Sequence, residues 1–394
     1  MKSTAKICPI CGSKDLTIFL ERKNVPVVQN FLLKDSNAAK NIEKENLKLA
    51  VCNNCEFVFN MDFDFSKLKY GNNYDNNQTC SAYFKEHMDK LVNHLLYEEN
   101  IQNCKIIEIG SGNGIFLKKL VDNQKLNNTG VGFDPSYNGQ TEEIENKLIF
   151  KTEYYCDEHS GLNADIIISR HVIEHIQNPL EFLRLLRKNL KDTVEAKVYF
   201  ETPCVEWILK NKVIWDFFYE HCSYFSENSL KTAFEMAGFQ VDKVEKIFGS
   251  QYLWIKAVVS TKKESFTPIK KESKFKELAV EFSKSEKQIL DKFKQQLINT
   301  KSKGKTAVWG AGAKGVTFLN LIDPDVELVD FLVDINPDKQ DKYIVGSGHK
   351  VVSPESINKY GIKTLIIMNP NYKQEIISII DDLNLKLDLI EMEL

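Results

Sequence analysis

Four of the nine cysteines in this 394-residue chain form two closely spaced pairs, Cys8 with Cys11 and Cys52 with Cys55. Each pair has the spacing Cys-x-x-Cys, which brings two thiolates to one edge of a tetrahedron. In a reducing compartment, two such pairs far apart in sequence indicate a zinc site and not disulfides. Four thiolates leave no position for water, so we expect a structural zinc ion.

A second group of residues suited to chemistry lies in the aromatic-rich stretch 217–226, which contains Glu220 and His221. Histidine acts as a general base near neutral pH, and a nearby carboxylate can orient its ring and stabilise its cation. Aromatic side chains around the pair would restrict water. The alternative is a packed core histidine beside a surface glutamate, and composition alone leaves both interpretations open.

These groups must be positioned by a larger fold, and residues 105–120 indicate which one. A short apolar run is followed by Gly110, Gly112 and Gly114 and then by an apolar-periodic segment. The pattern predicts a strand, a glycine turn and a helix whose first N–H groups can bind a ligand. With Glu108 two residues before the first glycine, it resembles motif I of class I S-adenosylmethionine-dependent methyltransferases. A bare structural turn is the alternative.

Strands and helices alternate after this turn. Asp134, followed by Pro135, ends the second predicted strand, where an acid can accept both ribose hydroxyls of an adenosyl ligand. A strand-end turn aspartate is the alternative. The other predicted strands are 148–155, 165–170 and 196–201, with late strands near 241–248 and 252–259 that would close a seven-stranded sheet with an antiparallel edge.

The fourth predicted strand ends at Arg170 and continues into the run His171 to His175, with Glu174 before the second histidine. Ligands of open α/β sheets lie outside the carboxyl ends of the strands, so this run should face the cofactor and substrate. A zinc protease would need glutamate directly after the first histidine, which this run lacks. The sequence from Asn178 to Glu181 then predicts a capped helix start.

The C-terminal part contains a second glycine turn, Gly310 to Gly315, after a predicted strand, and Asp334 ends a later strand. Its spacing is that of the dinucleotide fingerprint, which keeps an NAD(P)-linked oxidoreductase open. Contact with a phosphate or nucleotide and a bare structural turn are the other interpretations. An apolar stripe before this turn predicts a linker helix.

Composition limits the partners. The length exceeds what one hydrophobic core usually serves, so several domains are expected. A net charge of −3 gives no electrostatic footprint for nucleic acid or an anionic membrane surface, and no apolar run is long enough for a membrane span. Because the first residues lack the apolar part of a secretory signal, we expect a cytoplasmic protein. We also expect a small-molecule partner and a monomer or weak dimer.

Taken in chain order, four motifs resemble the three-domain sugar C-methyltransferases over nearly the whole chain: the paired cysteines, the Glu108–Gly114 turn, the Glu220–Ser226 run and the Trp309–Gly315 run. The resemblance implies an α/β protein whose class I methyltransferase domain is a doubly wound sheet at 76–262. It also implies a zinc-binding domain at 1–75, a linker helix at 263–303 and a Rossmann-like domain at 304–394 that binds a sugar nucleotide and no dinucleotide.

The resemblance further implies methyl transfer from S-adenosylmethionine to C3 of a nucleotide-linked 4-keto deoxysugar through an enolate. O-methylation of a sugar hydroxyl is the nearest alternative, and a non-catalytic zinc-and-nucleotide-binding module is a more distant one. The expected catalytic residues are His221, Glu220, His175 and Tyr224. The expected cofactor contacts are Glu108, Gly110, Gly112, Gly114, Asp134, Pro135, Arg170, His171 and Tyr83, and the expected substrate contacts are Tyr219, Lys314 and Asn369.

The sequence departs from the family at one position. Family members usually carry a tyrosine three residues before the base histidine, where this chain has Phe218. Tyr219 is adjacent, but it would point elsewhere if the local geometry is kept. Because this hydroxyl is missing, the departure counts against either the assignment of His221 as the base or the chemistry at the ketone.

Overall fold

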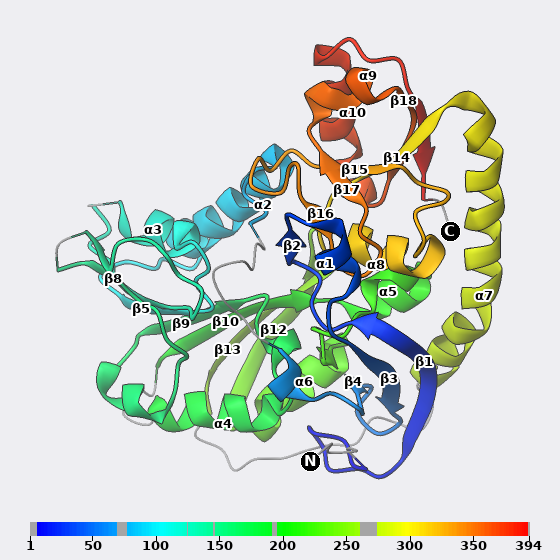
Figure 1. Ribbon diagram of the computed structural model, residues 1–394. Coiled ribbons are helices and arrows are strands. Elements are labelled where there is room, and N and C mark those ends of the chain that lie inside the picture. The colour runs from blue at the N-terminus through cyan, green and yellow to red at the C-terminus, as the bar shows by residue number, and fades with distance from the viewer. Residues whose placement is uncertain are drawn as a thin grey trace.

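The computed structural model describes residues 6–68, 77–123, 125–144, 146–190, 195–260 and 274–392. The predicted domain boundaries at 75/76 and 262/263 lie outside these residues. Three β-sheets organise the chain, one for each predicted domain, and the long helix α7 (Phe275–Thr300) runs along one side of the molecule between the first and last of them (Figure 1). No helix in these described ranges is long and apolar enough to cross a membrane.

The central sheet has the strand order β12-β13-β10-β9-β5-β6-β8-β7. Strands β10, β9, β5, β6 and β8 are parallel, β13 is antiparallel to both of its neighbours, and β7 is antiparallel to β8. The sequence predicted an antiparallel strand at the edge of the sheet. The structure instead places the antiparallel strand β13 next to the edge strand β12. Strand β7 was not predicted. The bounds are β5 Lys105–Ile109, β6 Thr129–Phe133, β7 Glu142–Ile144, β8 Leu148–Lys151, β9 Ile166–Arg170, β10 Lys197–Pro203, β12 Phe239–Ile247 and β13 Tyr252–Val259.

Helices cover both faces of this sheet, because its parallel strands are apolar on both sides. The buried residues of α2 (Ala82–Asn93) and α3 (Ile115–Val121) form one core with the strands, and those of α4 (Pro179–Asn189) and α6 (Glu227–Met236) form another on the opposite face. Helix α4 begins at Pro179 as predicted. The Asn178 side chain, however, makes no capping hydrogen bond.

The C-terminal sheet has the order β19-β18-β14-β15-β17-β16-β2, with β14 parallel to β15 and β18. Its bounds are β14 Lys305–Trp309, β15 Phe331–Val333, β16 Tyr343–Ile344, β17 Lys350–Val352, β18 Ile362–Ile367 and β19 Asp388–Glu391, with helices α8 Ala313–Ile322, α9 Ile357–Tyr360 and α10 Lys373–Asp382. Glu375 of α10 accepts hydrogen bonds from Ser81 Oγ (2.5 Å) and Ala82 N (2.6 Å) at the start of α2, which ties this domain to the central one.

The N-terminal sheet consists of β1 (Leu16–Pro26), β3 (Lys44–Cys52), β4 (Val58–Asn60) and β11 (Ser223–Tyr224). Its last strand therefore comes from the middle of the chain. In return β2 (Leu32–Leu33), which precedes the short helix α1 (Ser36–Lys40), pairs with β16 of the C-terminal sheet. The three domains thus exchange strands, and the predicted contiguous ranges do not describe this exchange.

A buried arginine reinforces the exchange. Arg22 of β1 donates to the carbonyl oxygens of Ile214 (2.6 Å) and Phe217 (2.8 Å), and its Nε donates to Glu286 of α7 (2.8 Å). Hydrogen bonds from a charged donor to buried carbonyls are among the stronger ones in proteins. Arg22 therefore holds the segment before His221 against the N-terminal sheet.

Candidate active site

A cavity of about 250 Å³ opens between the carboxyl ends of the central strands and the C-terminal domain. Most of its walls come from three parts of the chain, and the remainder comes from Asn30, Asn77, Gln78, Cys80, Ser81, Pro203 and Tyr252. The run after β9 contributes His171, Glu174 and His175, the segment before β11 contributes Asp216, Phe218 and His221, and the C-terminal domain contributes Gly310, Gly312, Lys314, Asp334, Lys339, Asn369 and Tyr372. The structure thus brings the predicted base together with the second glycine turn.

Two histidines meet in this cavity. The rings of His175 and His221 lie 4.7 Å apart and almost perpendicular, and His175 Nδ1 donates to the backbone carbonyl of Glu220 (3.1 Å). Burial lowers the pKa of His175 and holds the pKa of His221 well below 6.5, with His175, His171 and Lys314 lowering it further. Both imidazoles are therefore neutral at pH 7, the form in which a histidine accepts a proton or binds a metal.

Glu220 does not orient His221. Its carboxylate is fully buried, neither oxygen has a hydrogen-bond partner within the described part of the chain, and His221 Nδ1 has none either. Burial raises the pKa of Glu220 to about 8. Glu220 lies in a turn directly before His221, and the predicted contact between the two side chains does not form. Glu220 contacts the site only through its backbone carbonyl.

Two predicted tyrosines lie outside the cavity walls. The Tyr219 hydroxyl accepts a hydrogen bond from the Asp64 backbone N–H (2.9 Å), and its ring packs on Phe63. The Tyr224 hydroxyl bonds both the N–H and the carbonyl of Phe218 at 3.0 Å. We therefore correct both assignments: Tyr219 belongs to the N-terminal core, and Tyr224 holds the backbone of Phe218.

The first glycine turn adjoins the cavity without lining it. Gly110 and Gly114 have φ values of 76° and 77°, and a Cβ would lie 2.1 Å from Val172 at the first and 2.5 Å from Phe150 at the second. Only glycine fits these positions, and Val172 places the turn against the run that carries His171 and His175. Gly112 also has a positive φ, and its N–H donates to Asp134 Oδ2 (2.8 Å), while Oδ1 accepts from the N–H of Ser136 beyond Pro135.

A charged network lies behind this turn. Glu201, which ends the β10 pairing with β9 and which the sequence analysis missed, accepts from Arg170 Nε (2.7 Å) and bonds His87 Nε2 (2.7 Å). Burial would raise the pKa of Glu201, but Arg170, His171 and His87 outweigh burial and hold it well below 4.5. The rule that sites gather at the carboxyl ends of parallel strands could have identified Glu201 from the sequence.

Two further predicted cofactor contacts are Glu108, which is buried, and Tyr83, which is half-buried. Burial raises the pKa of Glu108 to about 8, partly offset by Arg170. Tyr83 packs against Phe248 and Tyr372, outside the cavity walls. The structure therefore does not place Tyr83 at the cavity.

The C-terminal side of the cavity is polar. Lys314, in the first turn of α8, forms an ion pair with Asp216 (2.7 Å), and Asn369 exchanges two hydrogen bonds with Gln251 (2.8 and 3.0 Å). These two of the three predicted substrate contacts thus line the cavity and are anchored to the central domain. The Asp334 carboxylate accepts backbone N–H groups of Ala311 and Asn336. Asp134 makes the same kind of backbone contacts at the first glycine turn.

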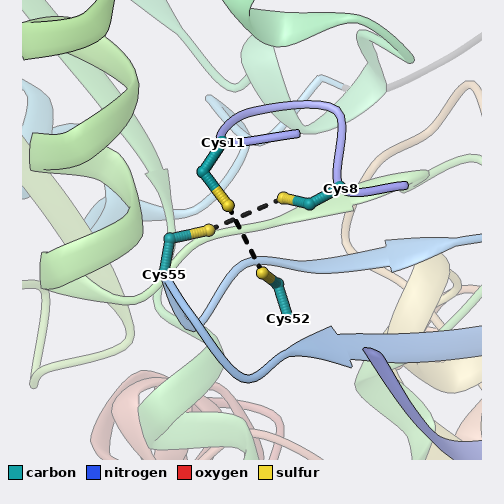
Figure 2. Close-up of side chains that lie close together, drawn as sticks. All are labelled: Cys8, Cys11, Cys52 and Cys55. Atoms are coloured by element: carbon teal, nitrogen blue, oxygen red, sulfur yellow. Dashed lines mark hydrogen bonds between the residues drawn. The ribbon is translucent and has the colours of Figure 1, made fainter. Parts of the chain in front are cut away.

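The four paired cysteines converge on one point (Figure 2). Cys8 Sγ lies 3.6 Å from Cys55 Sγ, Cys11 Sγ lies 3.5 Å from Cys52 Sγ, and all four sulfur atoms lie within 4.8 Å of one another. The nine cysteines, all within the described part of the chain, form no disulfide bond. Four sulfur atoms from two Cys-x-x-Cys turns match the donor set and arrangement of a tetrahedral zinc site.

Two family models match the chain. Residues 81–244 match a family described as a methyltransferase domain, and residues 259–384 match one described as a C-methyltransferase C-terminal domain. A curated relative, the C-methyltransferase NovU of Streptomyces niveus, is 24% identical over 402 residues, which cover 94% of this chain and 91% of the relative.

Solved structures with similar parts include a Burkholderia thailandensis 1,6-didemethyltoxoflavin-N1-methyltransferase with bound S-adenosylhomocysteine. It is 12% identical, covers 46% of this chain and 81% of its own, and has a TM-score of 0.34. Human N-acetylserotonin methyltransferase in complex with SAM is 14% identical, with a TM-score of 0.33 and coverage of 44% and 55%. The strand order and the family match together give residues 81–244 the class I methyltransferase fold, and the chain is a methyltransferase.

Proposed function

We propose that this methyltransferase transfers a methyl group from S-adenosylmethionine to a carbon atom next to the ketone of a nucleotide-linked sugar. One observation carries the proposal: a neutral, half-buried histidine, His221, faces a cavity that the methyltransferase domain shares with the glycine turn of the C-terminal domain. The C-methyltransferase description of the C-terminal family and of NovU supports carbon as the acceptor.

A carbon acid needs a base, and the cavity offers one. A ketone acidifies the neighbouring C–H bond, His221 takes that proton, and the bond's electron pair forms the enolate carbon that attacks the methyl group. Bound S-adenosylmethionine would supply the methyl group from its sulfonium; the S–CH3 bond breaks and S-adenosylhomocysteine leaves. The buried, apolar ring of Phe218 beside His221 limits water, and His175 lies where it can share the proton.

The C-terminal turn suits the nucleotide part of the substrate. Lys314 and Lys339 line the cavity beside Gly310 and Gly312, where the N–H groups at the start of α8 favour an anion. A sugar nucleotide laid against this turn would direct its sugar toward His221. We further propose that the four-cysteine cluster holds a structural zinc ion, since its closed donor set leaves no site for catalysis.

The test is product analysis with methyl-labelled S-adenosylmethionine and a panel of nucleotide-linked sugars, with and without a 4-ketone, in heavy water. The proposal expects label on a carbon and exchange of the α-proton of the keto sugar without turnover. Label on oxygen of a non-keto sugar, with no exchange at carbon, would establish O-methylation instead. Hydride transfer from a nicotinamide cofactor would favour the oxidoreductase.

A further inference from the structure

Tyr252 lies at the wall of the cavity and is the first residue of β13. It is paired with Pro203 at the end of β10, which also lines the cavity, so strand pairing places it at the carboxyl edge of the central sheet. The side chain is only 8% exposed, yet its hydroxyl forms no hydrogen bond with any residue that the structure describes. Buried tyrosine hydroxyls usually have a partner, so a free one at a cavity wall points to a ligand.

Neighbouring rings fix the orientation of Tyr252. Its ring is stacked on that of Phe248 (4.7 Å between centroids, 2° between planes) and meets the ring of His171 edge to face (4.6 Å, 73°). Burial raises the pKa of Tyr252 well above 10, and Tyr372 and Glu201 raise it further. The phenol therefore keeps its proton at neutral pH and is a hydrogen-bond donor held in one place.

The turn before Tyr252 is strained. Residues 248–250 all have positive φ values, of 51°, 63° and 67°, and a left-handed conformation is uncommon for a bulky residue such as Phe248. Gln251 then exchanges two hydrogen bonds with Asn369 of the C-terminal domain (2.8 and 3.0 Å). Strained backbone persists only where the surrounding contacts impose it, and it gathers at functional sites. These contacts keep the turn in the form that places Tyr252 at the cavity.

We propose that Tyr252 donates a hydrogen bond to the ketone oxygen of the substrate while His221 removes the α-proton. This role rests on the proposed function. As the proton leaves, the electron pair of the C–H bond forms a carbon–carbon double bond, and the carbonyl π electrons move onto the oxygen. A fixed, neutral donor in a cavity with little water stabilises that negative charge. When the enolate carbon attacks the methyl group the carbonyl forms again, so Tyr252 keeps its own proton throughout.

Other polar groups of the cavity wall already have partners. Lys314 is paired with Asp216 (2.7 Å), and Ser81 Oγ donates to Glu375 (2.5 Å). A group that is already bonded must give up a partner before it donates to a developing oxyanion. Tyr252 has no such bond to break, and donors that need no rearrangement are the ones that stabilise a transition state most.

Contacts between side chains connect Tyr252 to the base. Its ring contacts His171, and the run that begins there carries His175, whose ring lies 4.7 Å from that of His221. Tyr372 presents a second hydroxyl at the wall, but it belongs to the C-terminal domain, which the proposed function assigns to the nucleotide. Tyr252 belongs to the domain that carries the first glycine turn. It is therefore the phenol on the side of the cavity where the sugar is expected to react.

The test compares Tyr252→Phe with Tyr199→Phe in the full-length protein. Exchange of the α-proton of a nucleotide-linked keto sugar in heavy water is followed by NMR, and S-adenosylmethionine affinity by calorimetry. Tyr252→Phe should slow exchange about a hundredfold and leave affinity and melting temperature unaltered, because its hydroxyl bonds nothing in the described protein. Tyr199 is also stacked, on Trp254, but its hydroxyl bonds Glu99 (3.0 Å). Tyr199→Phe should therefore lower the melting temperature and leave exchange unchanged.

A double variant separates a chemical role of Tyr252 from a structural one. Phe218→Tyr in the Tyr252→Phe protein should speed exchange by a larger factor than it does in the wild type, because a new hydroxyl then replaces a missing one. Equal exchange in Tyr252→Phe and the wild type, or weaker S-adenosylmethionine binding without slower exchange, would overturn the role of Tyr252 and leave C-methylation standing. A wild type that exchanges no α-proton and methylates oxygen refutes the proposed function together with this role.

Discussion

The ring of Phe218 lies 4.2 Å from the imidazole of His221, and both side chains line the cavity. Tyr224 fixes the backbone of Phe218 at both its N–H and its carbonyl. The most reactive group of the site is thus packed against a ring without a polar atom. This contact determines how close water and substrate oxygens come to the histidine.

Phe218→Tyr should raise kcat with little change in KM, because the added hydroxyl can donate to the developing enolate oxygen. One such donor is typically worth about 10²–10³ in rate at optimal geometry, and we expect up to about tenfold here. Steady-state kinetics would measure it. Phe217→Tyr is the control: that ring is fully buried against Tyr224 and Phe282, so its change should lower stability and leave kcat unaltered. A lower kcat for Phe218→Tyr would contradict the prediction.

Asp134→Ala should weaken S-adenosylmethionine binding by about 1.5–3 kcal/mol, since the ribose loses a charged acceptor. Calorimetry measures this directly. Asp334→Ala provides the comparison, because Asp334 accepts a backbone N–H from its own glycine turn just as Asp134 does. An equal loss in both variants would show that the effect is general destabilisation and not cofactor contact.

Cys52→Ser should remove about one equivalent of zinc and lower the free energy of unfolding, since structural zinc sites contribute directly to folding. Elemental analysis and a thermal melt measure the two effects. Cys104→Ser, which lies outside the cluster, should change neither the zinc content nor the melting temperature. Protein purified without chelator that contains no zinc would refute the site.

Glu220→Gln should stabilise the protein at neutral pH. The Glu220 carboxyl has a pKa of about 8 in the folded protein against an ordinary 4.5, so its contribution to stability is fully present below pH 4.5 and is lost as the pH rises to 8. The wild type should lose on the order of 3–5 kcal/mol across that window, and the variant should not. Urea unfolding at pH 5 and pH 8 measures the difference.

Glu201→Gln is the matched control for that experiment. Its folded pKa lies below 4.5, so it contributes stability above pH 4.5 that is lost as the pH falls. Glu201→Gln should therefore lower the free energy of unfolding at neutral pH, whereas Glu220→Gln should raise it. If both variants changed the free energy of unfolding in the same direction, burial and not ionisation would govern both effects.

His221→Ala should abolish α-proton exchange and methyl transfer together. The loss of a positioned base typically costs about 10²–10⁴ in rate. Proton exchange in heavy water, followed by NMR on a keto sugar nucleotide, measures the first step. Exchange that survives in the variant would move the base elsewhere in the cavity.

The sequence predicted the elements with strong local signals. The glycine turns, the cysteine pairs and the run after β9 depend on residue type and short spacing, and the structure places them at a cluster or beside one cavity. The orientation of Glu220 depends on backbone direction at a single peptide, which spacing does not report. The partners of Tyr219 and Arg22 are 155 or more residues away in sequence and could not be deduced from local pattern.

The exchange of β2 and β11 has a consequence for how such a chain can change over time. A recombination event that carried residues 81–244 into another gene would carry β11 away from the N-terminal sheet, and the loss of residues 1–68 would remove β2 from the C-terminal sheet. The first event leaves the edge of β4 unpaired and the second leaves the edge of β16 unpaired. Exposed strand edges promote aggregation. The exchange therefore predicts that the three domains are inherited as a unit.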